Sequence, residues 1–108
     1  MKAFVACLFL VLLCPLAKAD AQKPILIIIK NHHFTPAEIH VPSGKEAIFI
    51  VKNLDSTVEE FESLALNIES VVEAKSEIKI TLPPTEHGHY TFVGDYNDKI
   101  ARGVIIVD

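Results

Sequence analysis

The segment Glu77-Ile78-Lys79-Ile80-Thr81-Leu82 alternates polar and aliphatic residues over six positions and stops at Pro83-Pro84. Successive side chains of a β-strand point to opposite faces, so this alternation predicts a strand with its isoleucines and leucine on one buried face. Proline cannot donate to a strand ladder, and the two prolines therefore mark the end of the strand. Similar short segments, bounded by turn residues, recur along the chain.

The other apolar segments have the length and β-branched composition of strands. They are residues Ile25–Ile29, Glu38–Val41, Ala47–Val51, Tyr90–Phe92 and Gly103–Val107. The first is a solid apolar run, which we expect to be buried on both faces. Strands at a spacing of about 8–12 residues, with no helical stripe between them, predict an all-β fold, an antiparallel Greek-key β-sandwich. The segment from Ser63 to Lys75 fits either a turn of helix or a short edge strand.

The N-terminal residues have the pattern of a cleavable secretory signal. An apolar run from Ala3 to Leu13 is followed by Ala17 and Ala19, which supply the small-x-small cleavage pattern. The run is too short to span a bilayer comfortably. We expect residues 1–19 to be removed, which leaves residues 20–108 as a single exported domain. Cleavage after Ala21 is an alternative.

Removal of this leader changes the chemistry that the chain can support. Both cysteines, Cys7 and Cys14, leave with it, which excludes a disulfide framework and a thiolate-based blue-copper centre. Removing Lys2 and Lys18 from the 10 Lys and Arg residues leaves 8 against 14 Asp and Glu, a formal net charge of −6. An acidic domain without a basic run argues against nucleic acid as a partner and against insertion into an anionic membrane.

Three polar clusters interrupt the apolar pattern. They are Asn31-His32-His33, Glu59-Glu60-Phe61-Glu62 and Gly94-Asp95-Tyr96-Asn97-Asp98. In an extended chain Glu60 and Glu62 share one face, and Asp95 and Asn97 share another. Neighbouring carboxylates disfavour their charged forms unless they are solvated or neutralised by a cation. The alternatives are a solvated strand face beside loop histidines, or a metal site for Cu(II), Zn(II) or iron.

A second histidine pair, His87 and His89, shares a face if it lies on a strand. Such a pair can hold a divalent metal, but the preceding prolines also fit an exposed turn. Hydrolase chemistry is disfavoured because the chain has no Gly-x-Ser-x-Gly motif. A glycosidase pair of Glu60 or Glu62 with Asp95 would need a sugar cleft that so small a sandwich has little room to form.

Several of these segments together resemble exported cupredoxin-like domains. The similarity begins with residues 31–45 (NHHFTPAEIHVPSGK), continues through residues 51–55 and 59–63, and ends with residues 88–96 and 100–107. The tetrapeptide Glu60-Phe61-Glu62-Ser63 resembles the thiolate-lacking cupredoxin-like proteins of bacterial ferrous-iron permease systems. The resemblance covers almost the whole mature chain.

This resemblance implies a periplasmic protein that binds copper, as Cu(II), or iron. Its partners would be an inner-membrane iron permease and other periplasmic iron-uptake proteins. The implied role is Fe(II) oxidation, electron transfer or metal delivery, an accessory role rather than that of an enzyme. A cupredoxin-fold interaction module without metal is the alternative.

The resemblance also implies the metal ligands. They are His32, Glu60, Glu62 and Asp95, with His33, Asn97, His87 and Asp98 as substitutes. The sequence departs from the family pattern at two positions, where Asp95 replaces a glutamate and Asn97 replaces a histidine. Because an amide is a poorer metal ligand than an imidazole, the second change bears directly on affinity and metal choice.

Overall fold

The computed structural model describes residues 23–108, and these residues form nine β-strands and one short 3-10 helix. The predicted leader and both cysteines lie outside them. No helix of the described part is long and apolar enough to cross a membrane. The elements are β1 (Ile25–Lys30), β2 (His33–Thr35), β3 (Glu38–Val41), β4 (Ala47–Asn53), β5 (Glu59–Ser63), β6 (Ile68–Val72), β7 (Glu77–Leu82), β8 (Gly88–Gly94), η1 (Asp95–Asn97) and β9 (Arg102–Val107).

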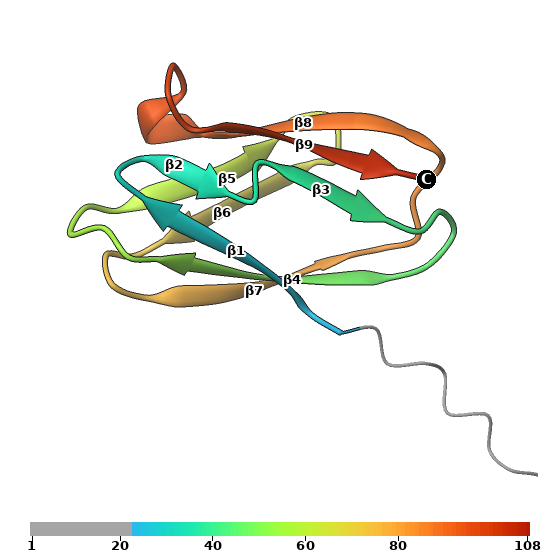
Figure 1. The fold of residues 1–108 in the computed structure, drawn as a ribbon, viewed down its shortest axis with the longest axis horizontal. Helices are drawn as coiled ribbons and strands as arrows, with labels where there is room; N and C mark the ends of the chain where they lie inside the picture. The colour runs from blue at the N-terminus through green and yellow to red at the C-terminus, as the bar shows by residue number, and fades with distance from the viewer. Residues whose placement is uncertain (1–22) are drawn as a thin grey trace, which may run out of the picture.

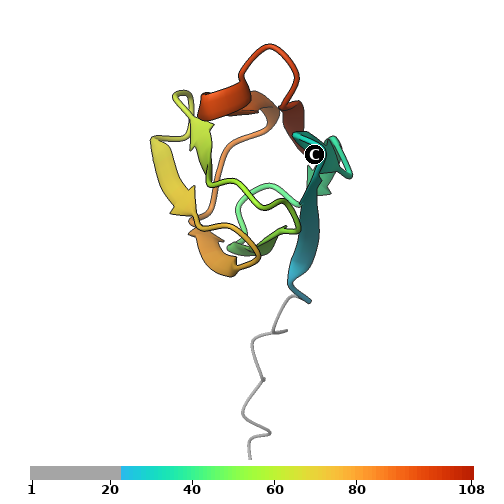
Figure 2. The same cartoon turned by 90° about the vertical axis from the view of Figure 1, so that its left-hand side faces the viewer.

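The strands form two sheets that face each other across the core (Figure 1). One has four strands in the order β2-β1-β4-β7, and the other has five in the order β3-β9-β8-β5-β6. Viewed from the end, the two sheets enclose the core from opposite sides (Figure 2). The predicted all-β sandwich is therefore confirmed.

Strand pairing differs from the purely antiparallel arrangement expected from the sequence. Strand β1 runs parallel to β4, and β3 runs parallel to β9, so both sheets are mixed. The two residues between β2 and β3, Pro36 and Ala37, carry the chain from the first sheet to the second. A local hydrophobic pattern reports which face of a strand is buried but not the direction of its neighbour, so the pattern could not distinguish the two arrangements.

Burial corrects one expectation and resolves another. In β1, Ile27 and Ile29 are fully buried but Leu26 is 48% exposed, so the expectation that this run is buried on both faces is wrong. The strand lies in a sheet with one face against the core and the other toward solvent. The segment from Ser63 to Lys75 contains the edge strand β6, which resolves the alternatives in favour of a strand.

Three phenylalanines join the two sheets in the core. Phe34 on β2 makes edge-to-face contacts with Phe61 and Phe92, at ring-centroid distances of 5.7 and 4.9 Å. Phe61 and Phe92, on the adjacent strands β5 and β8, stack at 4.8 Å. Each such pair contributes about 0.5–1.5 kcal/mol beyond the area that it buries. The trio fixes β5 and β8 against the opposite sheet.

The β1–β2 hairpin turns through Asn31 and His32, whose φ angles are 50° and 61°. Two successive residues with positive φ match the twist of a two-residue hairpin, and Asn and His adopt this left-handed conformation more readily than most residues with a side chain. The Asp55 carboxylate accepts the Asn31 N–H at 2.7 Å and the His32 N–H at 3.0 Å. Asp55 therefore stabilises this turn from the loop after β4.

Burial acts to raise the pKa of Asp55, but the hydrogen bonds from His32 and Asn31, with the charges of His32 and Lys75, lower it below its ordinary 3.8. The stability that Asp55 supplies is thus present above pH 3.8 and is lost as the pH falls through its folded-state pKa. We expect Asp55→Ala to lower the free energy of unfolding by about 1–3 kcal/mol near neutral pH.

Urea unfolding followed by circular dichroism measures this difference, which should shrink in acid. Asp98→Asn is the control, because Asp98 is exposed and its side chain is found in no hydrogen bond of the described residues. Equal stability of Asp55→Ala and the wild type at neutral pH would contradict the assigned role of Asp55.

Candidate metal centre

Strand β5 presents two glutamates on the outer face of the five-stranded sheet. Its central residue, Phe61, is fully buried in the core. Because side chains alternate along a strand, Glu60 and Glu62 project from the opposite face. Glu60 lies opposite Val71 of the edge strand β6 and is only 8% exposed. One of the two carboxylates is therefore buried on a face that otherwise meets solvent.

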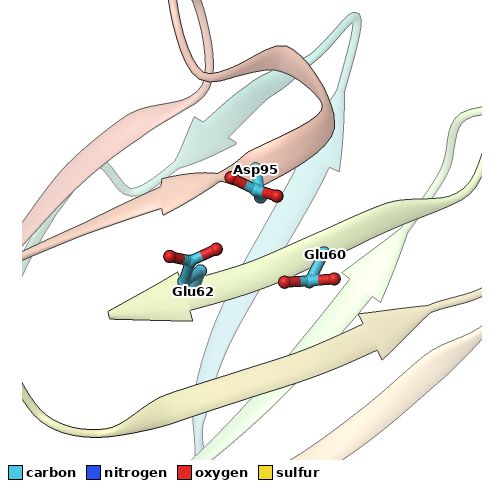
Figure 3. Close-up of side chains that lie close together, drawn as sticks. All are labelled: Glu60, Glu62 and Asp95. Carbon is cyan, nitrogen blue, oxygen red and sulfur yellow. The ribbon is translucent and has the colours of Figure 1, made fainter. Parts of the chain in front are cut away.

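Pairing of β5 with β8 brings a third carboxylate to these two. Phe61 pairs with Gly94, so the next residue of the chain, Asp95, begins η1 beside Glu60 and Glu62 (Figure 3). Gly94 has no room for a side chain, because a Cβ atom there would lie 2.6 Å from the Glu59 Cδ. The close packing of β8 on β5 thus requires glycine at this position.

The side chains of Glu60, Glu62 and Asp95 form a compact carboxylate group, called the triad below. Each offers an oxygen, and these three oxygens lie within 4.8 Å of one another. Among residues 23–108 no lysine, arginine or histidine forms a salt bridge with them. The Oε1 atom of Glu60 is buried without a hydrogen-bond partner. A bound cation would supply both the missing charge and the missing partner.

Burial and the repulsion between neighbouring carboxylates shift the pKa values of Glu60 and Glu62. Burial raises the pKa of Glu60 above its ordinary 4.5, the negative charges of Glu69 and Asp95 raise it further, and a hydrogen bond between Tyr96 and the Glu60 carboxyl group lowers it. Burial likewise raises the pKa of Glu62, with added repulsion from Asp95, Glu60 and Glu69. Full ionisation of the metal-free triad is therefore unfavourable, which is the electrostatic condition that a metal ion relieves.

Glu69 is a fourth carboxylate beside the triad, and the sequence pattern did not predict it there. It lies on β6 directly opposite Glu62. The signal that could have found it is the β5–β6 hairpin, which turns through Asn67 with a φ of 56°. Because the sequence from Ser63 to Lys75 fits both a helix and a strand, its register against β5 cannot be predicted from the sequence alone.

The histidines expected to join the carboxylates do not reach them. His32 lies in the β1–β2 turn of the other sheet, with its Nδ1 atom 3.7 Å from the Asp55 Oδ2. His33 is exposed on β2. In the part of the chain described here, the group of potential ligands contains only carboxylates. The described structure therefore does not bring His32 to Glu60 and Glu62, and its ring lies beside Asp55 instead.

The substitute ligands also lie outside the triad. His87 Nδ1 is 3.0 Å from the backbone oxygen of Val107, and His89 is exposed on β8. Asp98 is exposed after η1. None of the three belongs to the carboxylate group found among residues 23–108.

Asn97 was expected to share a face with Asp95, and this expectation is wrong. The two residues belong to a 3-10 helix, which turns by about 120° per residue, so positions two apart diverge. Asn97 donates its side-chain N–H to Glu59 Oε2 at 2.7 Å and is directed away from the triad.

The fold and the site can now be compared with known proteins. The family model of the cupredoxin-like domain matches residues 3–107. The chain belongs to this family. An uncharacterized protein of Rickettsia prowazekii (strain Madrid E) is 39% identical over 84 residues, which are 78% of this chain and 67% of that protein.

Several solved structures share the fold at low sequence identity. The metal-binding domain of the Cu(I)-exporting P-type ATPase CopA of Streptococcus pneumoniae D39 superposes with a TM-score of 0.67 at 21% identity, covering 79% of this chain and 84% of that one. Auracyanin A, a blue copper protein of Chloroflexus aurantiacus, gives 0.66 at 13% identity, covering 80% and 98%. A purple cupredoxin of Nitrosopumilus maritimus gives 0.58 at 17% identity, covering 78% and 99%.

Neutralising one triad carboxylate should stabilise the metal-free cupredoxin domain. Because the folded-state pKa values of Glu60 and Glu62 are raised, the stability linked to their protons is present below pH 4.5 and is lost as the pH rises through the folded-state values. We expect Glu62→Gln to raise the melting temperature of the chelator-treated protein by a few degrees near neutral pH.

Thermal unfolding followed by circular dichroism between about pH 4 and pH 8 measures this effect. Glu77→Gln is the matched control, since Glu77 is exposed on β7 in the other sheet. A melting temperature for Glu62→Gln below that of the wild type at neutral pH would contradict the repulsion argued for the triad.

Proposed function

We propose that this cupredoxin-like protein binds an iron ion at Glu60, Glu62 and Asp95. The observation that carries the proposal is the buried Oε1 atom of Glu60, which has no partner and lies in a carboxylate group without a counter-charge. A buried charged group without a partner is costly, and a bound metal ion removes that cost. A solvated strand face does not explain why Glu60 is 8% exposed.

The donor atoms favour iron over the copper of the solved cupredoxins. The triad offers only carboxylate oxygens, which suit hard cations such as Mg(II), Ca(II) and Mn(II). Of the two metals that the resemblance implies, iron is the harder and lies closer to this group. Cu(I) prefers thiolate and thioether ligands, and neither lies in the triad. Cu(II) accepts oxygen ligands and is the closest competitor. The residues therefore fit a hard oxygen-bound cation and do not fit the thiolate centre of a blue copper protein.

We place this function in ferrous-iron uptake in the periplasm, with an inner-membrane iron permease and other periplasmic uptake proteins as partners. The support is the resemblance of Glu60-Phe61-Glu62-Ser63 to the proteins of such systems, together with the expected signal peptide. Delivery is favoured over electron transfer, because the triad lies on the outer face of a sheet and Asp95 is exposed. An accessible ion held by carboxylates can pass to a partner.

Anaerobic calorimetry of the mature domain with Fe(II), in parallel with Cu(II) and Mn(II), tests the proposal. We expect one equivalent of Fe(II) to bind. The double variant Glu60→Gln/Glu62→Gln should lose affinity by more than about 100-fold while remaining folded, since even changes outside the ligand shell cost about 10–100-fold. Electron paramagnetic resonance of the Cu(II) and Mn(II) forms should show oxygen ligands without imidazole nitrogen.

The matched control is Glu46→Gln/Glu77→Gln, which removes the same charge from exposed positions outside the triad. Its affinity should equal that of the wild type. Weak, non-stoichiometric binding of all three metals would overturn the proposal and leave the interaction module as the remaining function. Tight Cu(II) binding with a nitrogen spectrum would place the metal at the histidines instead.

A further inference from the structure

Behind the triad, on the core side of β5, lies a buried carboxylate that is not one of its ligands. Glu59 is 2% exposed and accepts three hydrogen bonds. Its Oε1 atom accepts the backbone N–H groups of Glu60 and Tyr96, both at 3.0 Å. Its Oε2 atom accepts the side-chain N–H of Asn97 at 2.7 Å. The charge of Glu59 is thus satisfied by donors from β5 and η1.

These hydrogen bonds attach η1 to β5 beyond the point where the strand pairing between β5 and β8 ends. The ladder between β5 and β8 has only two residue pairs and ends at Phe61 and Gly94. The residue before η1 provides no side-chain cap, so Glu59 satisfies an N–H of the first turn from a neighbouring strand. Of the three bonds, two come from η1, whose first residue is Asp95.

We propose that Glu59 and Asn97 are positioning residues that hold Asp95 against Glu60 and Glu62 and so set the metal affinity of the triad. The proposal rests on the proposed function. Asn97 suits this role because its amide donates to a carboxylate, whereas an aspartate there would place a second negative charge against buried Glu59. On this view Asn97 contributes to the site through Asp95, without touching the metal.

A double-mutant cycle distinguishes a positioning role of Asn97 from general stabilisation, because the losses of metal affinity are then not additive. With Mn(II) as the probe, we expect Asn97→Ala and Asp95→Asn each to weaken binding by about 10–100-fold. If Asn97 acts through Asp95, the double variant Asn97→Ala/Asp95→Asn binds no more weakly than Asp95→Asn alone. Asp98→Asn, the same change in an exposed neighbour, should leave the affinity unchanged. Additive losses in the double variant would overturn the proposal.

An exchange of the two side chains tests the pair directly. Asn97→Asp breaks the donor–acceptor match by placing two carboxylates against each other, whereas Glu59→Gln/Asn97→Asp restores it with donor and acceptor reversed and the total charge equal to that of the wild type. We expect the double variant to recover most of the Mn(II) affinity that Asn97→Asp loses. If a single variant does not fold, the Mn(II) affinity of the folded Glu59→Gln/Asn97→Asp variant still tests the pair. An affinity as weak as that of Asp95→Asn would refute the role proposed for Glu59 and Asn97.

Amide hydrogen exchange of the metal-free protein separates this proposal from the proposed function. Asn97→Ala should speed exchange of the Tyr96 N–H, which Glu59 accepts, and the Glu59→Gln/Asn97→Asp variant should slow it again. If the wild type binds no metal, the proposed function fails. The exchange rate of the Tyr96 N–H then decides by itself whether Asn97 and Glu59 position Asp95 against Glu60 and Glu62. If metal binds but neither exchange nor affinity changes in Asn97→Ala, positioning fails and the proposed function stands.

Discussion

The pairing of Phe61 with Gly94 holds the core and the triad in one arrangement. On the inner face it stacks Phe61 on Phe92 at 4.8 Å, and on the outer face it brings Asp95 to the glutamates of β5. The absence of a side chain at Gly94 leaves the space that the Glu59 carboxylate occupies. A slip of one residue in this register would turn the phenylalanine outward and the glutamates into the core. Core packing therefore enforces the geometry of the site.

The two faces of β5 use carboxylates in opposite ways. Glu59, on the inner side, is buried but accepts three hydrogen bonds, so its charge is stabilised by fixed donors. Glu60, on the outer side, is nearly as buried, and one of its oxygens has no partner. The same residue type thus has a structural environment at one position and a ligand-binding environment at the next. This contrast distinguishes the triad from an ordinary acidic surface.

The fold is shared with copper proteins, yet the ligands in the triad differ from theirs in kind. Auracyanin A is a blue copper protein, and a blue site needs a cysteine and histidines. This chain has no cysteine after Cys14, and the described structure brings carboxylates together without a histidine. A fold can host unrelated sites, so the likeness to copper proteins establishes the architecture, and the donor atoms carry the argument for the metal.

The sequence alone determined the β-sandwich, the shared face of Glu60 and Glu62, and the absence of cysteine after Cys14, because alternation and composition are local properties. Strand direction, the place of Glu69, and the separation of His32 from the carboxylates were decided by the tertiary structure. Each depends on which distant segments become neighbours. The placement of Asn97 against Glu59 shows the difference most clearly: a single 3-10 turn rotated a predicted ligand away from the triad and onto a buried carboxylate of β5.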